Sequence, residues 1–294
     1  MATILSVVTP IFNGERFVER CYASLKAQTF ADWEWVVVDD GSTDGTAKAL
    51  GGIHDCRLRI VRLPHNEGRG SARARALNEA RGDWMVVWDV DDLNYPDRLA
   101  RVNSARLEGY DFCCSYAVVV DNALRMKGVR GFEPAFRVLP RYFVHPTLAC
   151  RTDLARDIGY DPALRAGEDL TLMLTLARRY RGQFIDEALM IYQEDREVNL
   201  DKAIASNESQ LLQVRRLYRS GVLDRNLWSY VATAMRWRTK LLLLKGMRLY
   251  PSVYLRTVPL RSYGQTTPGW SLSSDRTEFL RALQQEYRSG TAPS

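Results

Sequence analysis

Residues 84–92 read WMVVWDVDD, an apolar run that ends in three carboxylates within four positions. The five apolar residues at 84–88 predict a buried strand. Asp89, Asp91 and Asp92 end it, because aspartate is a poor strand former. Like charges this close destabilise one another unless a positive group lies among them. The stretch therefore predicts a buried strand that carries an acidic loop, and a positive partner for that loop.

The residues before this stretch alternate between strand and helix patterns. Short apolar runs at 4–9, 33–38 and 58–63 predict three more buried strands, and helical spacing occurs at 16–28 and 69–81. Strands that alternate with helices predict a mixed, mostly parallel α/β sheet with helices on both faces. Ligands of such sheets bind outside the carboxyl ends of the strands.

Polar residues follow three of the predicted strands and should meet at that edge. They are Asn13 and Glu15, then Asp39 and Asp40, then Asp89, Asp91 and Asp92. An isolated DxDD is more often a solvated turn, but here it shares its edge with other acids. Closely spaced carboxylates suit Mg²⁺ or Mn²⁺, which takes few protein ligands and completes its shell with phosphate and water. We expect such a cation to bridge the acids to a diphosphate.

Composition limits the class of protein. A chain of 294 residues with 46% hydrophobic and 26% charged residues is typical of one globular domain with an appendage. Five scattered cysteines without a CxxC pair indicate buried thiols in a reducing compartment. We read no signal peptide before Pro10 and no apolar run near 18 residues, so we expect a cytoplasmic protein.

Four blocks resemble family 2 glycosyltransferases and occur in the family's order. They are SVVTPIFNGE…VVVDDGSTDGT (6–46), HNEGRGSARARALNEARGDW (65–84), WDVDDLNYPDRL (88–99) and HPTLACR…GEDLTLMLTLA (145–177). The resemblance covers residues 4 to about 190. It implies the GT-A fold and inverting transfer of a sugar from a nucleotide diphosphate, with UDP favoured on family frequency alone.

The resemblance also implies donor-side roles. It places the nucleotide beside Thr9, Pro10, Asn13, Glu15, Asp40, Arg73 and Asp89, and the metal on Asp91, Asp89 and Asp92. Asp40 would accept from the base N–H, or cap the following GSTDG turn, although Asp39 is the better cap. Arg73 would face the phosphates. We expect Arg69, Arg75 and Arg81 to be solvated.

An inverting transfer needs one general base. By resemblance this is Asp169, with Glu168 orienting the acceptor or the base. The alternative is that both acids complement a helix N-terminus. A helix N-terminus would lower the pKa of Asp169, and a desolvated pocket would raise it. His145 is either a packed core residue or a contact to the donor pyrophosphate or the metal.

Residues 196–294 are expected to form a helical extension of a 1–195 catalytic domain. Helical spacing occurs at 202–221 and 227–246, and residues 226–262 carry seven basic residues with no Asp or Glu. Without a nucleic-acid motif, this segment favours an anionic membrane surface. A basic hairpin packed on the core is the alternative. A homodimer is compatible with this interpretation.

The expected acceptor is a glycan or a lipid-linked sugar in polysaccharide biosynthesis, reached at the inner face of the membrane. A nucleotidyltransferase is the alternative enzyme, but TPIFNGERF (9–17) is not its Gly-rich phosphate loop. A third class is a non-catalytic sugar-nucleotide or glycan-binding module. The presence of Asp89, Asp91 and Asp169 argues against this class.

Overall fold

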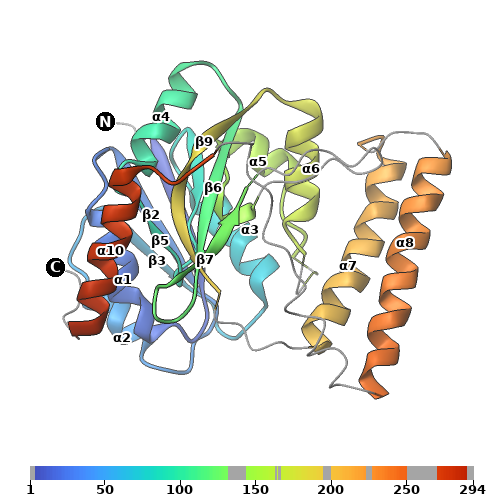
Figure 1. Cartoon of the computed structure of the whole chain (residues 1–294), viewed down its shortest axis with the longest axis horizontal. Helices are drawn as coiled ribbons and strands as arrows, with labels where there is room; N and C mark the ends of the chain where they lie inside the picture. Colours follow the sequence, from blue (N-terminus) through green and yellow to red (C-terminus); the bar gives the residue numbers. More distant parts are fainter. Residues whose placement is uncertain are drawn as a thin grey trace.

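The computed structural model describes residues 4–131, 144–162, 164, 167–194, 200–222, 227–249 and 270–289. The first four strands are β1 (Leu5–Ile11), β2 (Trp33–Asp39), β3 (Leu58–Arg62) and β4 (Trp84–Val87). They lie parallel in the order β3-β2-β1-β4, as the sequence predicts (Figure 1). Their carboxyl ends therefore form one edge. β1, β2 and β4 are buried, but the prediction of a buried strand at 58–63 was wrong, because β3 lies at the edge of the sheet and its Ile60 is 44% exposed.

Five more strands extend the sheet beyond β4. They are β5 (Leu93–Asn94), β6 (Phe112–Val120), β7 (Met126–Arg130), β8 (Ala149–Arg151) and β9 (Gly182–Gln193). Within the described residues the sheet has nine strands in the order β3-β2-β1-β4-β8-β6-β9-β5, with β7 beside β6. β8 runs antiparallel to β4 and β6, so the sheet is mixed. β5 follows the acidic loop directly and pairs with β9.

Helices cover both faces of the sheet, as predicted. One face carries α1 (Glu15–Lys26), α2 (Thr46–Gly51) and α4 (Arg98–Leu107), and the other carries α3 (Arg69–Glu79), α5 (Thr152–Ile158) and α6 (Leu170–Arg179). Side chains of a strand alternate between the two faces. Accordingly, Leu5 and Val7 pack with α1, whereas Val8 packs with α3. Each face thus has its own buried apolar layer.

The C-terminal helices occupy opposite sides of the sheet (Figure 1). α7 (Leu200–Arg219) and α8 (Leu227–Gly246) pack against each other, and Val214 and Leu217 of α7 pack on α6. α10 (Ser274–Ser289) returns to the sheet, where Leu280 joins the core around Tyr95 and Tyr116. The predicted division near residue 195 stays a prediction. No helix in the described part of the chain has the length and apolar character needed to cross a bilayer.

Candidate active site

The loops after β1 and β2 are tied together by polar side chains. Asn13 Oδ1 accepts the Thr43 N–H at 2.8 Å. Glu15 Oε2 accepts the Gly45 N–H at 3.0 Å. Asp39 Oδ1 accepts the Ser42 N–H at 2.9 Å, which confirms Asp39 as the turn cap. In the described structure Asn13 and Glu15 therefore shape the loop where the nucleotide is expected.

Thr9, Pro10 and Asp40 lie deeper at the same edge. The buried Thr9 hydroxyl accepts from Trp35 Nε1 at 2.9 Å, and contact of Thr9 with a nucleotide stays a prediction. Pro10 sits at the end of β1, beside Val38 of β2. Both carboxylate oxygens of the buried Asp40 accept main-chain N–H groups before α3, from Glu67 at 2.8 Å and Gly68 at 3.0 Å. The role of Asp40 toward a base stays a prediction.

Arg73 joins the donor side of the site to the acceptor side. Its Nη2 lies 2.9 Å from Asp89 Oδ1, and its Nε lies 3.2 Å from Glu168 Oε1. The Arg73 side chain is only 5% exposed. Burial acts to lower its pKa, but the surrounding negative charges, Asp89 above all, raise the pKa beyond its ordinary value. One buried guanidinium thus links the acidic loop to the Glu-Asp pair.

Arg69 is exposed, as predicted, but it also binds Glu168, a contact that the prediction did not include. Its Nε lies 2.8 Å from Glu168 Oε1. Residues four apart share one face of a helix, so the spacing from Arg69 to Arg73 indicates that both side chains can reach the same partner. Arg75, by contrast, makes a half-exposed ion pair with Glu79 on the same helix.

Gly70 allows α3 to approach the segment before α6. A Cβ at this position would lie 2.5 Å from the Asp161 carbonyl oxygen and 2.7 Å from that of Leu164. Both distances are shorter than any real Cβ contact, so a larger side chain would push the two segments apart. The glycine thereby brings the flanking Arg69 to within reach of Glu168.

Asp169 lies at the N-terminus of α6, but its side chain does not cap that helix. Burial raises its pKa to about 6, and the neighbouring Glu168 charge acts in the same direction, against Arg73 and Arg69. Desolvation and the Glu168 charge therefore outweigh the two arginines and the main-chain hydrogen bond, so the pKa shifts in the direction expected of a desolvated pocket. A carboxylate with such a pKa accepts protons near neutral pH and is suited to general-base catalysis.

α7 supports this end of α6. The buried Gln213 donates from Nε2 to the Gly167 carbonyl oxygen at 2.5 Å. Its Oε1 accepts the Thr171 hydroxyl at 3.0 Å. Gly167 has φ +69°, a left-handed conformation that glycine adopts without strain. The turn that carries Glu168 and Asp169 is thus held from a helix of the C-terminal extension.

Three arginines lie around the acidic loop and supply the positive charge that its sequence predicts. Arg73 binds Asp89, and Arg20 Nη2 donates to the Asp91 carbonyl oxygen at 3.0 Å. The buried Arg98 donates to the carbonyl oxygens of Val87 at 2.9 Å and Pro146 at 2.7 Å. Burial lowers the pKa of Arg98 to about 10, so it stays charged at neutral pH. Sequence analysis missed Arg20 and Arg98, whose partners lie far along the chain.

The acidic loop fits a cation that is completed by substrate. Within the described residues no group of three His, Cys, Asp or Glu side chains is preassembled for a metal. Mg²⁺ needs only one or two carboxylates when phosphate and water supply the rest. Asp91 and the Asp89 side chain are partly exposed, whereas Asp92 is buried and accepts the Gln193 N–H at 3.2 Å. Asp91 and Asp89 therefore fit a metal better than Asp92.

His145 is packed behind Arg73. It is buried, and its Nε2 lies 3.0 Å from the Tyr160 hydroxyl oxygen. Burial lowers the pKa of His145 well below its ordinary range, and the charges of Arg73 and Arg69 lower it further. The residue is thus neutral and hydrogen-bonded, as the packed alternative expects. Its contact with a donor or metal stays a prediction.

Comparisons with known proteins agree with this geometry. The profile of Glycosyl transferase family 2 matches residues 6–151. The putative glycosyltransferase EpsE of Bacillus subtilis (strain 168) is 31% identical over 207 residues, which cover 65% of this chain and 73% of that relative. The succinoglycan biosynthesis protein ExoO of Rhizobium meliloti (strain 1021) is 32% identical over 193 residues, 58% of this chain and 54% of the relative.

A solved structure supports the fold. S. aureus TarS 1–349, crystallised in complex with UDP-GlcNAc, matches with a TM-score of 0.67 at 21% identity. The match covers 98% of this chain and 92% of that chain. From its sequence and its GT-A fold, the chain belongs to glycosyl transferase family 2.

Proposed function

We propose that this glycosyltransferase moves a sugar, with inversion, from a nucleotide-diphosphate sugar to a hydroxyl of a glycan or lipid-linked acceptor. The observation that carries the proposal is the chain of contacts from Asp89 through Arg73 to Glu168, beside Asp169 with its raised pKa. It brings a donor-side acid and a base within one buried cluster. Relatives named for glycosyl transfer and polysaccharide biosynthesis favour the same function over nucleotidyl transfer.

Asp169 is the base in this proposal. As the acceptor oxygen bonds to the anomeric carbon, the hydroxyl proton passes to the Asp169 carboxylate. The bond between that carbon and the diphosphate oxygen breaks at the same time, and the nucleoside diphosphate leaves with the electron pair. Glu168, held by Arg69 and Arg73, fixes the turn and keeps the base at the acceptor side.

The donor side neutralises the leaving group. A divalent cation, when bound by Asp91 and Asp89, supplies Lewis-acid stabilisation of the diphosphate. Arg73 adds a fixed positive charge beside Asp89. Asn13, Glu15 and Asp40 shape the loops that receive the nucleotide. UDP is the nucleotide that we favour for the donor, from family frequency alone.

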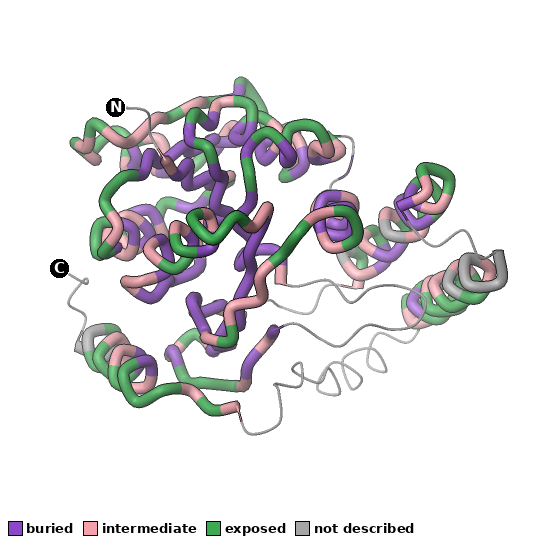
Figure 2. The backbone as a smooth tube through the Cα atoms, turned by 90° about the horizontal axis from the view of Figure 1, so that it is seen from above, coloured by how far each residue is buried: buried purple, intermediate pink, exposed green. Residues whose placement is uncertain are grey.

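We also propose that α8 docks on an anionic membrane, where a lipid-linked acceptor would be found. Met235 and Leu242 are 64% and 71% exposed, and they share a helical face with the exposed Arg238. Figure 2 shows most of the described backbone of α8 in the colours for exposed and intermediate residues. Lys245 and Arg248 instead pair with Glu208 and Asp201 of α7. Exposed apolar and basic side chains on one face are typical of interfacial helices. In this proposal the enzyme works at the inner face of the membrane, and a second copy of the chain is the competing partner for the exposed face of α8.

A donor screen tests the transfer reaction. UDP- and GDP-sugars are incubated with the enzyme with Mn²⁺, with Mg²⁺ or with EDTA, and thermal shift and release of nucleoside diphosphate are measured. We expect one donor class to stabilise the protein and be hydrolysed only with metal. Asp91→Asn should weaken donor binding at least tenfold, while Asp157→Asn on the exposed surface of α5 should leave it unchanged. Equal donor binding in EDTA, or by Asp91→Asn, would reject the metal assignment.

A further inference from the structure

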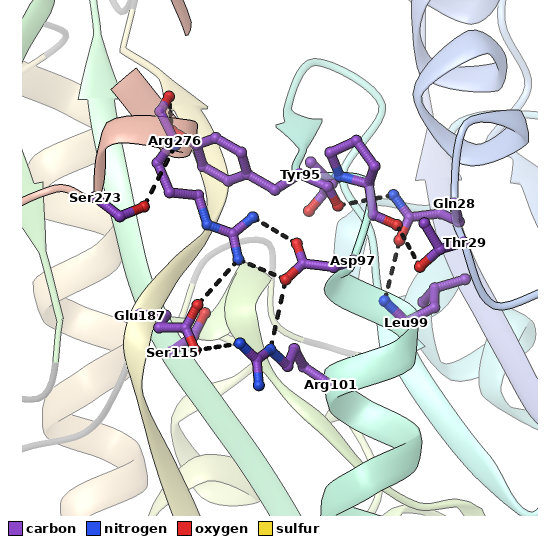
Figure 3. A network of polar contacts seen from close by, with 12 residues as sticks. Gln28, Thr29, Tyr95, Asp97, Leu99, Arg101, Ser115, Glu187, Ser273 and Arg276 are labelled. Atoms are coloured by element: carbon purple, nitrogen blue, oxygen red, sulfur yellow. Dashed lines mark hydrogen bonds and ion pairs between the residues drawn. The ribbon is translucent and has the colours of Figure 1, made fainter. Parts of the chain in front are cut away.

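Arg276 of α10 binds the segment that follows the acidic loop (Figure 3). Its Nη1 and Nη2 lie 2.5 Å and 2.6 Å from the two carboxylate oxygens of Asp97. Nη2 also lies 3.2 Å from Glu187 Oε2 on β9. This bidentate geometry fixes the guanidinium plane as well as its charge. A residue of the C-terminal helix is thus joined to two elements of the sheet domain.

A second arginine closes the ring. Arg101 Nη2 lies 2.6 Å from Glu187 Oε1, and its Nε lies 3.5 Å from Asp97 Oδ2 (Figure 3). Two guanidiniums therefore alternate with two carboxylates. The Arg276 side chain is only 10% exposed, whereas those of Asp97, Glu187 and Arg101 are 33%, 41% and 47% exposed. The ring is balanced in charge, and Arg276 is its most buried member.

Aromatic packing fixes the same segment. The Arg276 guanidinium lies over the Tyr95 ring, 4.4 Å from its centroid. The Tyr95 hydroxyl donates to the Arg276 carbonyl oxygen at 3.4 Å, and Phe279 packs on Tyr95 with ring centroids 5.2 Å apart. Tyr95 is fully buried. α10 therefore holds both Tyr95 and Asp97.

These contacts lie only a few residues from the acids expected to bind metal. β5 connects Asp92 to Tyr95, and the Tyr95 N–H donates to the Leu189 carbonyl oxygen of β9 at 3.1 Å. The far end of β9 holds the loop itself, because the Gln193 N–H donates to Asp92. β9 is thus tied to α10 through Glu187 and to the acidic loop through Gln193. A shift at residues 93–97 would move the loop.

We infer that α10 braces the acidic loop, and that Arg276 is a positioning residue for donor binding. It holds residues 93–97 against β9, so that Asp89 and Asp91 meet the donor diphosphate in a single arrangement. The inference rests on the proposed function, since it assigns the loop to a metal-bound nucleotide. Without the guanidinium the binding-competent arrangement would be only a fraction of the population, and the apparent affinity would fall by that fraction.

The test compares Arg276→Gln and Arg276→Lys with Arg281→Gln, an exposed arginine on the same helix. Amide hydrogen exchange of residues 91–99 is measured without ligand, at a temperature well below unfolding. We expect Arg276→Gln to speed exchange there, where the Tyr95 and Asp92 N–H groups are hydrogen-bonded, and to leave β2 unchanged. Arg276→Lys should restore part of the protection. Arg281→Gln should match the wild type.

Calorimetry with UDP or GDP and Mn²⁺ gives the second readout. Arg276→Gln should bind about tenfold more weakly, with kcat at saturating donor nearly unchanged, because the competent arrangement can still be reached. Faster exchange with unchanged nucleotide affinity would reduce Arg276 to a structural contact and overturn the inference. Unchanged exchange would overturn it as well. If the wild type binds no nucleotide, the proposed function fails, whereas the exchange result still decides whether α10 braces the loop.

Discussion

The molecule holds two clusters of arginines and carboxylates that differ in how their charges are matched. Around Asp97 and Glu187, two guanidiniums face two carboxylates in a closed ring. Around Arg73, two guanidiniums face three carboxylates, with Asp91 and Asp92 nearby on the acidic loop. One cluster is balanced, and the other carries an excess of negative charge.

The pKa values follow this difference. Burial acts to raise the pKa of Asp97, but the hydrogen bonds and charge of Arg276 lower it below its ordinary value. The pKa of Asp169 rises to about 6, because burial and Glu168 outweigh the two arginines. The balanced ring keeps Asp97 ionised and joins α10 to the sheet. The unbalanced cluster leaves one carboxylate ready to take a proton and a place for added positive charge.

The largest expected effect is on catalysis. Asp169→Asn should lower transfer by roughly 10²–10⁴-fold, because the variant cannot accept the acceptor proton. Donor affinity should stay within about twofold, since the base does not contact the nucleotide in this mechanism. Steady-state rates and donor calorimetry measure both, with Asp157→Asn as the control. Wild-type turnover in the variant would move the base elsewhere, with Glu168 as the next candidate.

Within the unbalanced cluster, removing the buried guanidinium should cost more stability than removing the partly exposed one. Arg73→Met leaves Glu168 and Asp89 without their buried partner and should lower the free energy of unfolding by about 3 kcal/mol or more. Arg69→Met should lower it by less than about 1 kcal/mol, because the Arg69 side chain is 44% exposed. Urea denaturation measures both. Equal losses would show that the burial of Arg73 does not decide its contribution.

The pH dependence of activity and of stability should report on Asp169 in the unbalanced cluster. The raised pKa of Asp169 keeps it protonated up to about pH 6, so kcat should fall about tenfold per pH unit below 6 and level off above it. Because the folded state binds this proton more tightly than the unfolded state does, the Asp169 contribution to stability falls as the pH rises from about 4 to about 6. Asp169→Asn should remove that fall. A kcat that is flat from pH 5 to 8 would contradict the assignment.

The smallest effect concerns the charges that face water. Arg236→Gln, Arg238→Gln and Lys240→Gln together should reduce sedimentation with anionic vesicles several-fold, at about 1 kcal/mol or less per charge. Binding should fall as salt is raised, whereas the buried pair of Arg73 and Glu168 should respond little. Arg281→Gln on α10 is the control. Equal binding to neutral vesicles, or none to anionic ones, would contradict membrane docking and favour a second copy of the chain as the partner of α8.

The sequence predicted what depends on local pattern. Apolar runs and strand-end acids gave the parallel strands, the acidic loop and the Glu-Asp turn, and helical spacing gave α7 and α8. It did not predict α10, or the contacts that Arg20, Arg98 and Arg276 make with residues 48 to 179 positions away, because no local spacing encodes such contacts. The pKa of Asp169 depends on opposing effects whose sizes only packing decides. The contact of Arg69 with Glu168 could have been predicted from the sequence, because Arg69 precedes Arg73 by four residues.

The position of Arg276 in the chain has a consequence for how the enzyme is made. Arg276 follows its partner Glu187 by 89 residues. At synthesis rates of about 5–20 residues per second, roughly 4–18 s pass between the two on the ribosome. During that time the sheet can form with Asp97 and Glu187 sharing only Arg101. The acidic loop would therefore receive its last support only after most of the polypeptide has been translated, which delays donor binding by the nascent chain.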